Sequence, residues 1–210
     1  MNIYQGLFYL LAGFTLYFGL LVIFRFFSSR KNETILEQVK DCNWKTKEAL
    51  RIVDIITESH DVKTFRFKRV NGEPFSIFSP GQFLSFQIKS DPKLLRSYSI
   101  SGSCENTSTL QVSIKLIPDG KGSAWFHQLV IGAEVYAFPP GGHFTDEGMN
   151  TPKIYVGGGI GITPLISMIK TGIDRSSLSP MYLFYGMNSV NDLVFHEELL
   201  LLSKTYQNFS

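Results

Sequence analysis

An arginine and a tyrosine stand two residues apart in the short run Arg96-Ser97-Tyr98-Ser99. In an extended strand, side chains two positions apart project to the same face. Arginine offers phosphate oxygens a planar fork of donors, and tyrosine offers a flat ring for stacking. The pair therefore suits a ligand that carries both a phosphate group and a planar ring system, and Ser99 could place a hydroxyl beside the reactive edge of that ring. Taken alone, the tetrapeptide could equally be a surface strand with a stray arginine.

A second phosphate-binding pattern follows downstream, in the run Gly120-Lys121-Gly122-Ser123. It leads into a helical-looking segment at residues 124–129. Backbone N–H groups at the start of a helix form an anion site, and Ser123 would add a hydroxyl to it. Two phosphate-binding patterns around one aromatic residue indicate a nucleotide-like cofactor with a phosphate tail.

A third glycine-rich run follows a predicted strand at residues 153–156 and reads Gly157-Gly158-Gly159-Ile160-Gly161-Ile162-Thr163-Pro164. Glycines let a pyrophosphate approach the backbone closely, and the N-terminus of the following helix favours its charge. Thr163 is a good N-cap, and Pro164 suits the first helical position. Because residue 162 is isoleucine, the run does not match the Gly-x-Gly-x-x-Gly fingerprint of dinucleotide-binding folds. A glycine-rich turn that packs a helix on a strand is the alternative.

The composition of the 210-residue chain excludes several other functions. Its formal net charge of +2 gives no indication of a nucleic-acid partner. Its two cysteines, Cys42 and Cys104, are too few for a tetrathiolate zinc or iron–sulfur site. They favour a reducing compartment, and a single disulfide between them stays open. The four histidines lie far apart, so no metal site is expected.

The elements that must position these residues begin with six short runs of β-branched and aromatic residues. The runs lie at residues 50–56, 62–67, 83–88, 97–101, 110–116 and 134–137. Turn sequences such as Asn71-Gly72 and Pro118-Asp119-Gly120 separate several of them. Six strands at this spacing predict a six-stranded antiparallel β-barrel over residues 47–148.

Residues 149–210 follow a different pattern, in which strands alternate with helices. Predicted strands at 153–156 and 181–185 are each followed by a predicted helix, at 164–171 and at 193–205. This β-α-β-α order predicts the beginning of a parallel α/β sheet.

The N-terminal residues predict a transmembrane helix. No charged side chain occurs before Arg25, and the apolar run from Ile3 to Phe24 is long enough to cross a hydrocarbon core of about 30 Å. Basic residues follow the run at Arg25, Arg30 and Lys31, which favours a retained anchor over a cleaved signal peptide and places the C-terminal side in the cytoplasm. We expect a single-pass anchor in membrane lipid at residues 1–27, a linker at 28–46, and soluble domains on the cytoplasmic side.

Over about residues 49–210, the order of these motifs resembles the ferredoxin–NADP reductase-like flavoproteins, including the cytochrome b5 reductase type. The family's Arg-x-Tyr-Ser/Thr motif resembles residues 96–99, and its Gly-x-x-Ser motif resembles residues 120–123. Its barrel-closing turn Gly-Pro-x-Gly-x-Phe is similar to residues 139–144, where proline replaces the first glycine. Its signature Gly-Gly-x-Gly-Ile-Thr-Pro is similar to residues 158–164. The resemblance implies a barrel that binds FAD, with FMN as the alternative, and an α/β domain that binds NADH or NADPH.

The same resemblance implies roles for the residues of the barrel. Arg96 would hold the flavin phosphate, Tyr98 would pack on the isoalloxazine ring, and Ser99 would form a hydrogen bond near its N5. Ser97 belongs to the same motif. The ribityl and phosphate chain would be lined by Ile114 and Lys115, and the pyrophosphate by Gly120, Lys121, Gly122 and Ser123.

In the α/β domain, the resemblance implies a nucleotide site after each strand. Thr163 would lie between the flavin and the nicotinamide. The glycine-rich signature contributes Gly158, Gly159, Ile160, Gly161 and Pro164, and the segment after the second strand contributes Gly186 and Asn188. The family often carries an arginine for the 2′-phosphate of NADPH where Asn188 stands, so NADH is favoured.

The function implied is that of a membrane-anchored NAD(P)H-dependent flavoprotein reductase, with Ser99 and Thr163 beside the reacting rings. It would pass electrons to a one-electron protein acceptor, such as an iron–sulfur protein, a cytochrome, or an oxygenase or desaturase. A complete nicotinamide domain of this family has about five parallel strands and usually a Cys-Gly turn, whereas two strands and no such turn are found here.

This difference predicts either a fragment of a longer reductase or a chain completed by another polypeptide. It leaves open whether these 210 residues are active alone. The alternative function is a non-catalytic, membrane-tethered flavin-binding or electron-carrier subunit. A structural adaptor without a cofactor conflicts with the pairing of Arg96 and Tyr98.

Overall fold

The computed structural model describes residues 44–89, 91–146 and 151–210. The predicted anchor at residues 1–27 and most of the predicted linker lie outside these ranges. Among the described residues, no helix combines the length and the apolar character needed to cross a membrane. Trp44, at the end of the predicted linker, is buried against Phe75 with 5.7 Å between ring centroids, so the folded core begins at this residue in the described part.

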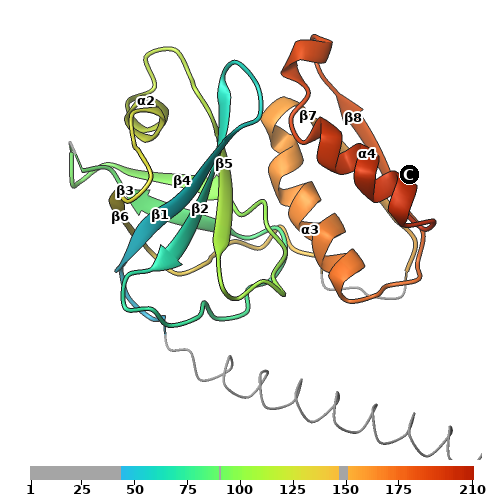
Figure 1. Cartoon of the computed structure of the whole chain (residues 1–210), viewed down its shortest axis with the longest axis horizontal. Coiled ribbons are helices and arrows are strands. Elements are labelled where there is room, and N and C mark those ends of the chain that lie inside the picture. The colour runs from blue at the N-terminus through green and yellow to red at the C-terminus, as the bar shows by residue number, and fades with distance from the viewer. Residues whose placement is uncertain (1–43, 90, 147–150) are drawn as a thin grey trace, which may run out of the picture. The chain divides into compact units, whose positions relative to one another are not determined.

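Six strands form the first sheet, as predicted. They are β1 (Glu48–Thr57), β2 (Val62–Arg69), β3 (Phe83–Gln87), β4 (Leu95–Ser99), β5 (Leu110–Lys115) and β6 (Glu134–Ala137). All pairs are antiparallel, and the order is β4-β3-β6-β1-β2-β5 (Figure 1). The two ends of this order meet beyond β4, where Ile100 bridges to Val112 and the Ser101 N–H donates to the Gln111 carbonyl at 2.8 Å. The predicted antiparallel arrangement is confirmed.

The short helix α2 (Lys121–His127) packs against the hydrophobic core formed by the strands of this sheet. Its Phe126 is fully buried and meets Phe86 and Tyr98 edge-on, at centroid distances of 5.0 and 5.3 Å. Such aromatic contacts favour defined ring orientations. The core therefore fixes the ring of Tyr98 and the start of α2 relative to each other.

The second part of the structure follows the predicted order of strands and helices. Its elements are β7 (Lys153–Gly158), the 3₁₀ turn η1 (Gly159–Gly161), α3 (Ile162–Asp174), β8 (Met181–Gly186), the 3₁₀ turn η2 (Val190–Asp192) and α4 (His196–Thr205). The strands β7 and β8 are parallel, and Phe209 forms a parallel bridge to Met181 of β8. The predicted parallel α/β pattern is confirmed, although α3 begins earlier and α4 later than the sequence predicted.

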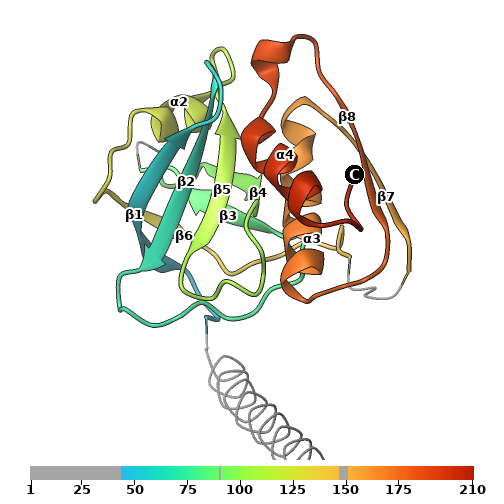
Figure 2. The same cartoon turned by 45° about the vertical axis from the view of Figure 1, so that its right-hand side comes forward.

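Helices α3 and α4 cover one face of the β7–β8 sheet (Figure 2). Tyr155 and Met181 are buried against these helices. On the other face, Ile154 pairs with Tyr182 and Val156 with Phe184. These four side chains are exposed in the described structure. Helix α3 also contacts the barrel, so it lies between the sheet and the barrel (Figure 2).

Candidate functional site

Strand β4 brings the predicted phosphate and ring contacts together. Arg96 pairs with Phe86 and Tyr98 with Leu84, so both side chains lie on the same face of β4. A Cβ atom added to Gly122 would lie 2.6 Å from Cγ of Arg96 and 3.1 Å from the Tyr98 hydroxyl. The start of α2 therefore lies directly beside both side chains, and only glycine leaves room for them.

The two side chains differ in their freedom to bind. Arg96 is exposed, its Nη1 donates to the neighbouring Leu95 carbonyl at 2.9 Å, and no ion pair to it is present among the described residues. Tyr98 is half-buried, and this burial raises its pKa to about 12 against the opposing charge of Arg96. At neutral pH the site thus combines an available cation with a neutral, firmly packed ring.

The glycine turn before α2 uses the Ser123 hydroxyl within itself. The Ser123 Oγ accepts a hydrogen bond from the Ile117 N–H at 3.0 Å and donates one to the Gly120 carbonyl at 3.1 Å. The expectation that this hydroxyl is offered to an anion is therefore not supported. The N–H groups of the first helical turn, at Lys121, Gly122 and Ser123, are the groups that such a turn leaves for an anion.

The two serines of the motif lie in different surroundings. Ser97 projects to the opposite face of β4 from Tyr98, where its Oγ lies 2.8 Å from that of Ser85. Ser99 pairs with Phe83 at the end of β4 and is half-buried.

Two further predicted flavin contacts, Ile114 and Lys115, lie at the end of β5. Ile114 is fully buried in the barrel core, so its side chain is not available to a ligand. Lys115 forms an ion pair with Asp61 at 3.1 Å and lines a cavity at the second candidate site. Burial acts to raise the pKa of Asp61, but hydrogen bonds from Lys115 and Ser59 outweigh it and hold that pKa below its usual range.

The second candidate site is a cavity of about 350 Å³ at the carboxyl ends of β7 and β8. In open parallel sheets, ligands bind at these ends of the strands. The cavity brings together the predicted residues Gly158, Gly159, Ile160, Gly186 and Asn188. Its barrel wall contains Lys115 and Asp61, and its α/β wall contains Asp192. The sequence analysis missed both aspartates, because no motif marks them and their meeting depends on the tertiary fold.

The predicted helix cap at Thr163 is wrong. Helix α3 begins two residues earlier than predicted, at Ile162, with Gly161 at the N-cap and Pro164 as the third helical residue. Ile162 is fully buried, and its packing extends the helix toward the glycines. Thr163 is 5% exposed, and its Oγ1 donates to the Ile160 carbonyl at 3.0 Å. Thr163 thus closes the turn at the entrance of the helix, beside the cavity lined by Ile160.

Two family models match the chain, one for each part of the structure. The oxidoreductase FAD-binding domain matches residues 49–145, and the oxidoreductase NAD-binding domain matches residues 155–210. The two matches divide the molecule between the antiparallel sheet and the parallel sheet.

Curated relatives include reductase components of oxygenase systems, a ferredoxin–NADP reductase and flavohemoproteins. A glycine betaine monooxygenase reductase subunit of Pseudomonas aeruginosa is 31% identical over 183 residues, which are 85% of this chain and 50% of the relative. A ferredoxin–NAD(P)(+) reductase component of naphthalene 1,2-dioxygenase/salicylate 5-hydroxylase systems from Ralstonia sp is 29% identical over 71% of this chain and 44% of the relative. The chain thus spans about half the length of the curated relatives it matches.

Solved structures share the fold. Phthalate dioxygenase reductase matches with a TM-score of 0.69 and 23% identity over 78% of this chain and 50% of that chain. The ferredoxin–NADP⁺ reductase of Plasmodium falciparum matches with a TM-score of 0.67 and 23% identity over 78% of this chain and 68% of that chain.

Proposed function

Because the chain belongs to the ferredoxin–NADP reductase-like flavoproteins, we propose that it takes electrons from NADH, passes them through FAD, and delivers them to a one-electron protein acceptor. The observation that carries this proposal is the meeting of Arg96, Tyr98 and Gly122 on one face of the barrel.

The barrel residues fit the flavin. FAD combines a planar ring with a pyrophosphate, and the site offers a protonated half-buried tyrosine ring, an unpaired exposed guanidinium in the described structure, and a backbone that glycine leaves accessible. When bound, the flavin supplies the redox chemistry, because it accepts a hydride from NAD(P)H and can release the electrons singly. Arg96 would hold the phosphates, Tyr98 would support the ring, and Ser99 would lie at its reactive edge.

The cavity at the carboxyl ends of β7 and β8 is the proposed nicotinamide nucleotide site. Gly158, Gly159 and Ile160 would approach the pyrophosphate, Gly186 and Asn188 would contact the adenosine end, and Thr163 would lie toward the nicotinamide. Among the cavity's lining residues, the only cation is Lys115, and it is paired with Asp61. A second carboxylate, Asp192, leaves the lining with a net negative charge. This charge disfavours the 2′-phosphate of NADPH and supports NADH as the donor.

The proposed acceptor is a component of an oxygenase system or an iron–sulfur protein. The named functions of the relatives from Pseudomonas aeruginosa and Ralstonia sp support this class of acceptor. We also propose that residues 1–27 anchor the chain in a membrane with the described domains on the cytoplasmic side. The support is the uncharged apolar run followed by Arg25, Arg30 and Lys31.

One observation favours a second candidate function. The apolar face formed by Ile154, Val156, Tyr182 and Phe184 is exposed in the described structure, whereas parallel sheets are normally covered on both faces. A sheet that another polypeptide covers on this face fits the second candidate, a non-catalytic, membrane-tethered flavin-binding or electron-carrier subunit.

Identification of the bound cofactor tests the flavin part of the proposal. Full-length chain is purified in detergent, the cofactor is released by denaturation, and the extract is separated by chromatography against FAD and FMN standards. We expect FAD in near-stoichiometric amount. Protein that folds but retains no flavin, even after incubation with added FAD, contradicts both candidate functions.

A further inference from the structure

Helix α3 connects the two candidate sites physically. It begins directly after the glycines of η1, which border the nucleotide cavity. Its barrel-facing side and its C-cap carry polar residues spaced four apart: Ser167, Thr171 and Arg175. Residues four apart lie on the same side of a helix. They meet the loop at residues 101–105, which follows β4 and therefore the proposed flavin-binding motif.

Hydrogen bonds join these residues mainly to the backbone of that loop. Ser167 Oγ donates to the Gly102 carbonyl at 2.7 Å, and Thr171 Oγ1 accepts from the Cys104 N–H at 3.1 Å. Both residues are fully or almost fully buried, with exposures of 0% and 2%. At the end of the helix, Arg175 Nε donates to the Glu105 carboxylate at 2.5 Å. We call these contacts the α3 clamp.

The buried hydroxyls restrict sliding of α3 along the loop, which apolar packing alone does not. An apolar helix face can shift along its partner with little loss of buried area, because the hydrophobic effect is non-directional. A hydrogen bond of fixed length resists such a shift, and leaving the buried Gly102 carbonyl or Cys104 N–H without a partner is unfavourable. The two hydroxyls therefore set the register of α3 against the loop after β4.

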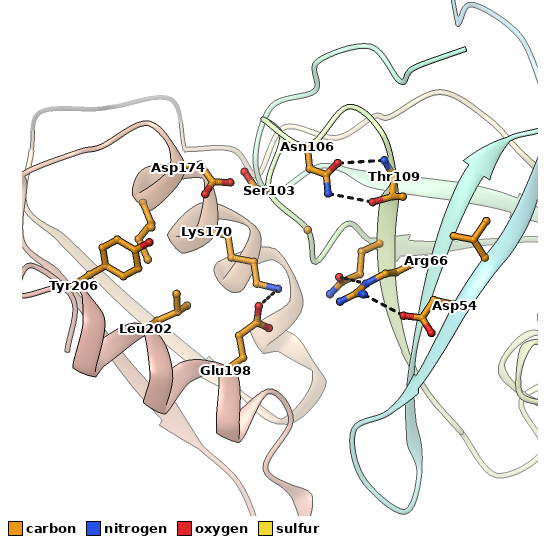
Figure 3. A pocket seen from close by; sticks show the side chains of 14 residues that line it. Asp54, Arg66, Ser103, Asn106, Thr109, Lys170, Asp174, Glu198, Leu202 and Tyr206 are labelled. Atoms are coloured by element: carbon orange, nitrogen blue, oxygen red, sulfur yellow. Dashed lines mark hydrogen bonds and ion pairs between the residues drawn. The ribbon is translucent and has the colours of Figure 1, made fainter. Parts of the chain in front are cut away.

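One charged residue beside the clamp adds a longer contact to the same loop, because Lys170 Nζ donates to the Ser101 carbonyl at 3.3 Å. A neighbouring cavity of about 580 Å³ separates α3 and α4 from the barrel strands (Figure 3). Lys170 and Arg66 point toward one another across it, but Lys170 pairs with Glu198 at 2.8 Å and Arg66 with Asp54 at 3.1 Å, each within its own wall (Figure 3). In the described part of the chain no ion pair joins the two walls of this cavity.

From this geometry we propose that Ser167 and Thr171 are positioning residues for hydride transfer. Through α3 they hold the nucleotide-binding glycines at a fixed position relative to the flavin-binding strand. This inference rests on the proposed function, in which a nicotinamide bound at the glycines must meet a ring bound at β4. A displacement of about 1 Å between reacting groups can slow a reaction on the order of 100-fold, so a helix register fixed by buried hydrogen bonds would affect the rate directly.

The test compares variants of the full-length chain that remove or keep the hydroxyls. Ser167→Ala/Thr171→Val removes both hydroxyls, and Thr171→Ser keeps both while removing only the methyl group of Thr171. The matched control is Ser203→Ala on α4, because the Ser203 hydroxyl is exposed and bonds only to Leu200 within its own helix.

The first readout does not depend on activity. Cys104 is 1% exposed beneath the clamp, and its burial raises the pKa of its thiol. In a Cys42→Ser background, the rate of maleimide labelling reports how often the clamp opens. We expect labelling to rise about tenfold or more in Ser167→Ala/Thr171→Val, as the rate follows the population of the open state, and to stay near the parent rate in Thr171→Ser and Ser203→Ala.

The second readout is the rate of anaerobic flavin reduction at saturating NADH, with flavin content measured beforehand. We expect a fall of about tenfold or more in Ser167→Ala/Thr171→Val, with flavin content and the KM for NADH little changed and with the rate restored in Thr171→Ser. If the double variant does not fold, Thr171→Val compared with Thr171→Ser carries the same test.

The outcomes separate the two proposals. Unchanged labelling in the hydroxyl-free variant overturns the clamp, and raised labelling with an unchanged reduction rate overturns its positioning role. If the parent chain retains flavin but is never reduced by NADH, the proposed function fails. The positioning role then fails with it, and raised labelling still supports the clamp as a structural contact.

Discussion

At the scale of single residues, the proposed flavin site depends on a cation that the protein leaves exposed. Arg96 has its alkyl chain beside Gly122 and its guanidinium at the surface, while Tyr98 next to it is held by the aromatic core. This arrangement separates the two tasks. The tyrosine ring is fixed by folding, and the arginine is available to the ligand.

Replacing Arg96 with alanine should therefore weaken flavin retention without unfolding the barrel. The expected loss of flavin-binding free energy is about 1.5–3 kcal/mol, the typical contribution of a hydrogen bond to a charged group. Flavin absorbance of the protein after dialysis measures it. The control is Arg51→Ala, which removes another exposed arginine, one that pairs with Glu134 of β6. Equal flavin occupancy in both variants would contradict the assignment of Arg96 to the flavin phosphate.

Asp61 gives a prediction about acid stability. Its pKa in the folded protein lies below the ordinary 3.8, so its contribution to the free energy of unfolding is complete above the unfolded value and is lost as the pH falls through the folded one. Asp61→Asn should thus be less stable than the parent chain at neutral pH, and the difference should shrink below about pH 4. Urea unfolding at both pH values measures this. A difference that is the same at both pH values contradicts the ion pair with Lys115.

At the scale of elements, the barrel and α3 meet at a second point besides the clamp. Gly81 precedes β3 and has a φ of +100°, and a Cβ atom added there would lie 2.2 Å from the Phe144 carbonyl oxygen and 2.5 Å from Cε of Met168 on α3. The methionine end could move aside, but the carbonyl belongs to the backbone. Glycine at this position therefore allows α3 and the barrel-closing turn to approach β3.

Gly81→Ala should be more destabilising than a glycine substitution that meets only backbone strain. Gly72→Ala is the matched control, because Gly72 also has a positive φ, of +80°, and an added Cβ meets nothing within 4 Å. We expect the free energy of unfolding of Gly81→Ala to fall by about 1–3 kcal/mol more than that of Gly72→Ala, the usual result of overpacking. Thermal unfolding of both variants measures the difference. Equal midpoints of thermal unfolding would mean that α3, the barrel-closing turn and the residues before β3 do not pack this closely.

Sequence patterns predicted local features of the strands and helices best. Alternation places Arg96 and Tyr98 on one face of a strand, and this local property was predicted correctly. The start of α3 was not, because burial of Ile162 extends the helix beyond the residue that propensity favours as a cap. Ser167 and Thr171 resemble ordinary polar residues of a helix, and only the tertiary fold shows that they face the loop after β4.

Within the candidate sites, the same limit applies to Ser123, Lys115 and Asp61. The sequence identifies Ser123 and Lys115 as polar residues next to a ligand motif. It does not reveal that the Ser123 hydroxyl closes its own turn, or that Lys115 pairs with a residue more than fifty positions earlier. Partners far apart in the chain leave no periodic pattern.

At the scale of the whole molecule, the first prediction concerns the membrane. The uncharged run before Arg25 leads us to expect the full-length chain in the membrane fraction, resistant to extraction with carbonate. A variant without residues 1–27 should be recovered in the soluble fraction and still retain flavin, because the described core begins at Trp44. Fractionation followed by immunoblotting measures both. Full-length chain in the soluble fraction would contradict the anchor.

In the proposed function, this molecule moves electrons from NADH to a flavin held by the barrel. Anaerobic mixing of the flavin-loaded, full-length chain with NADH, followed by absorbance of the oxidised flavin, tests it most directly. We expect a saturable loss of that absorbance, and a weaker response to NADPH because of the carboxylates Asp61 and Asp192 in the nucleotide cavity. Flavin that stays oxidised at every NADH concentration, in protein shown to be fully loaded, would contradict it.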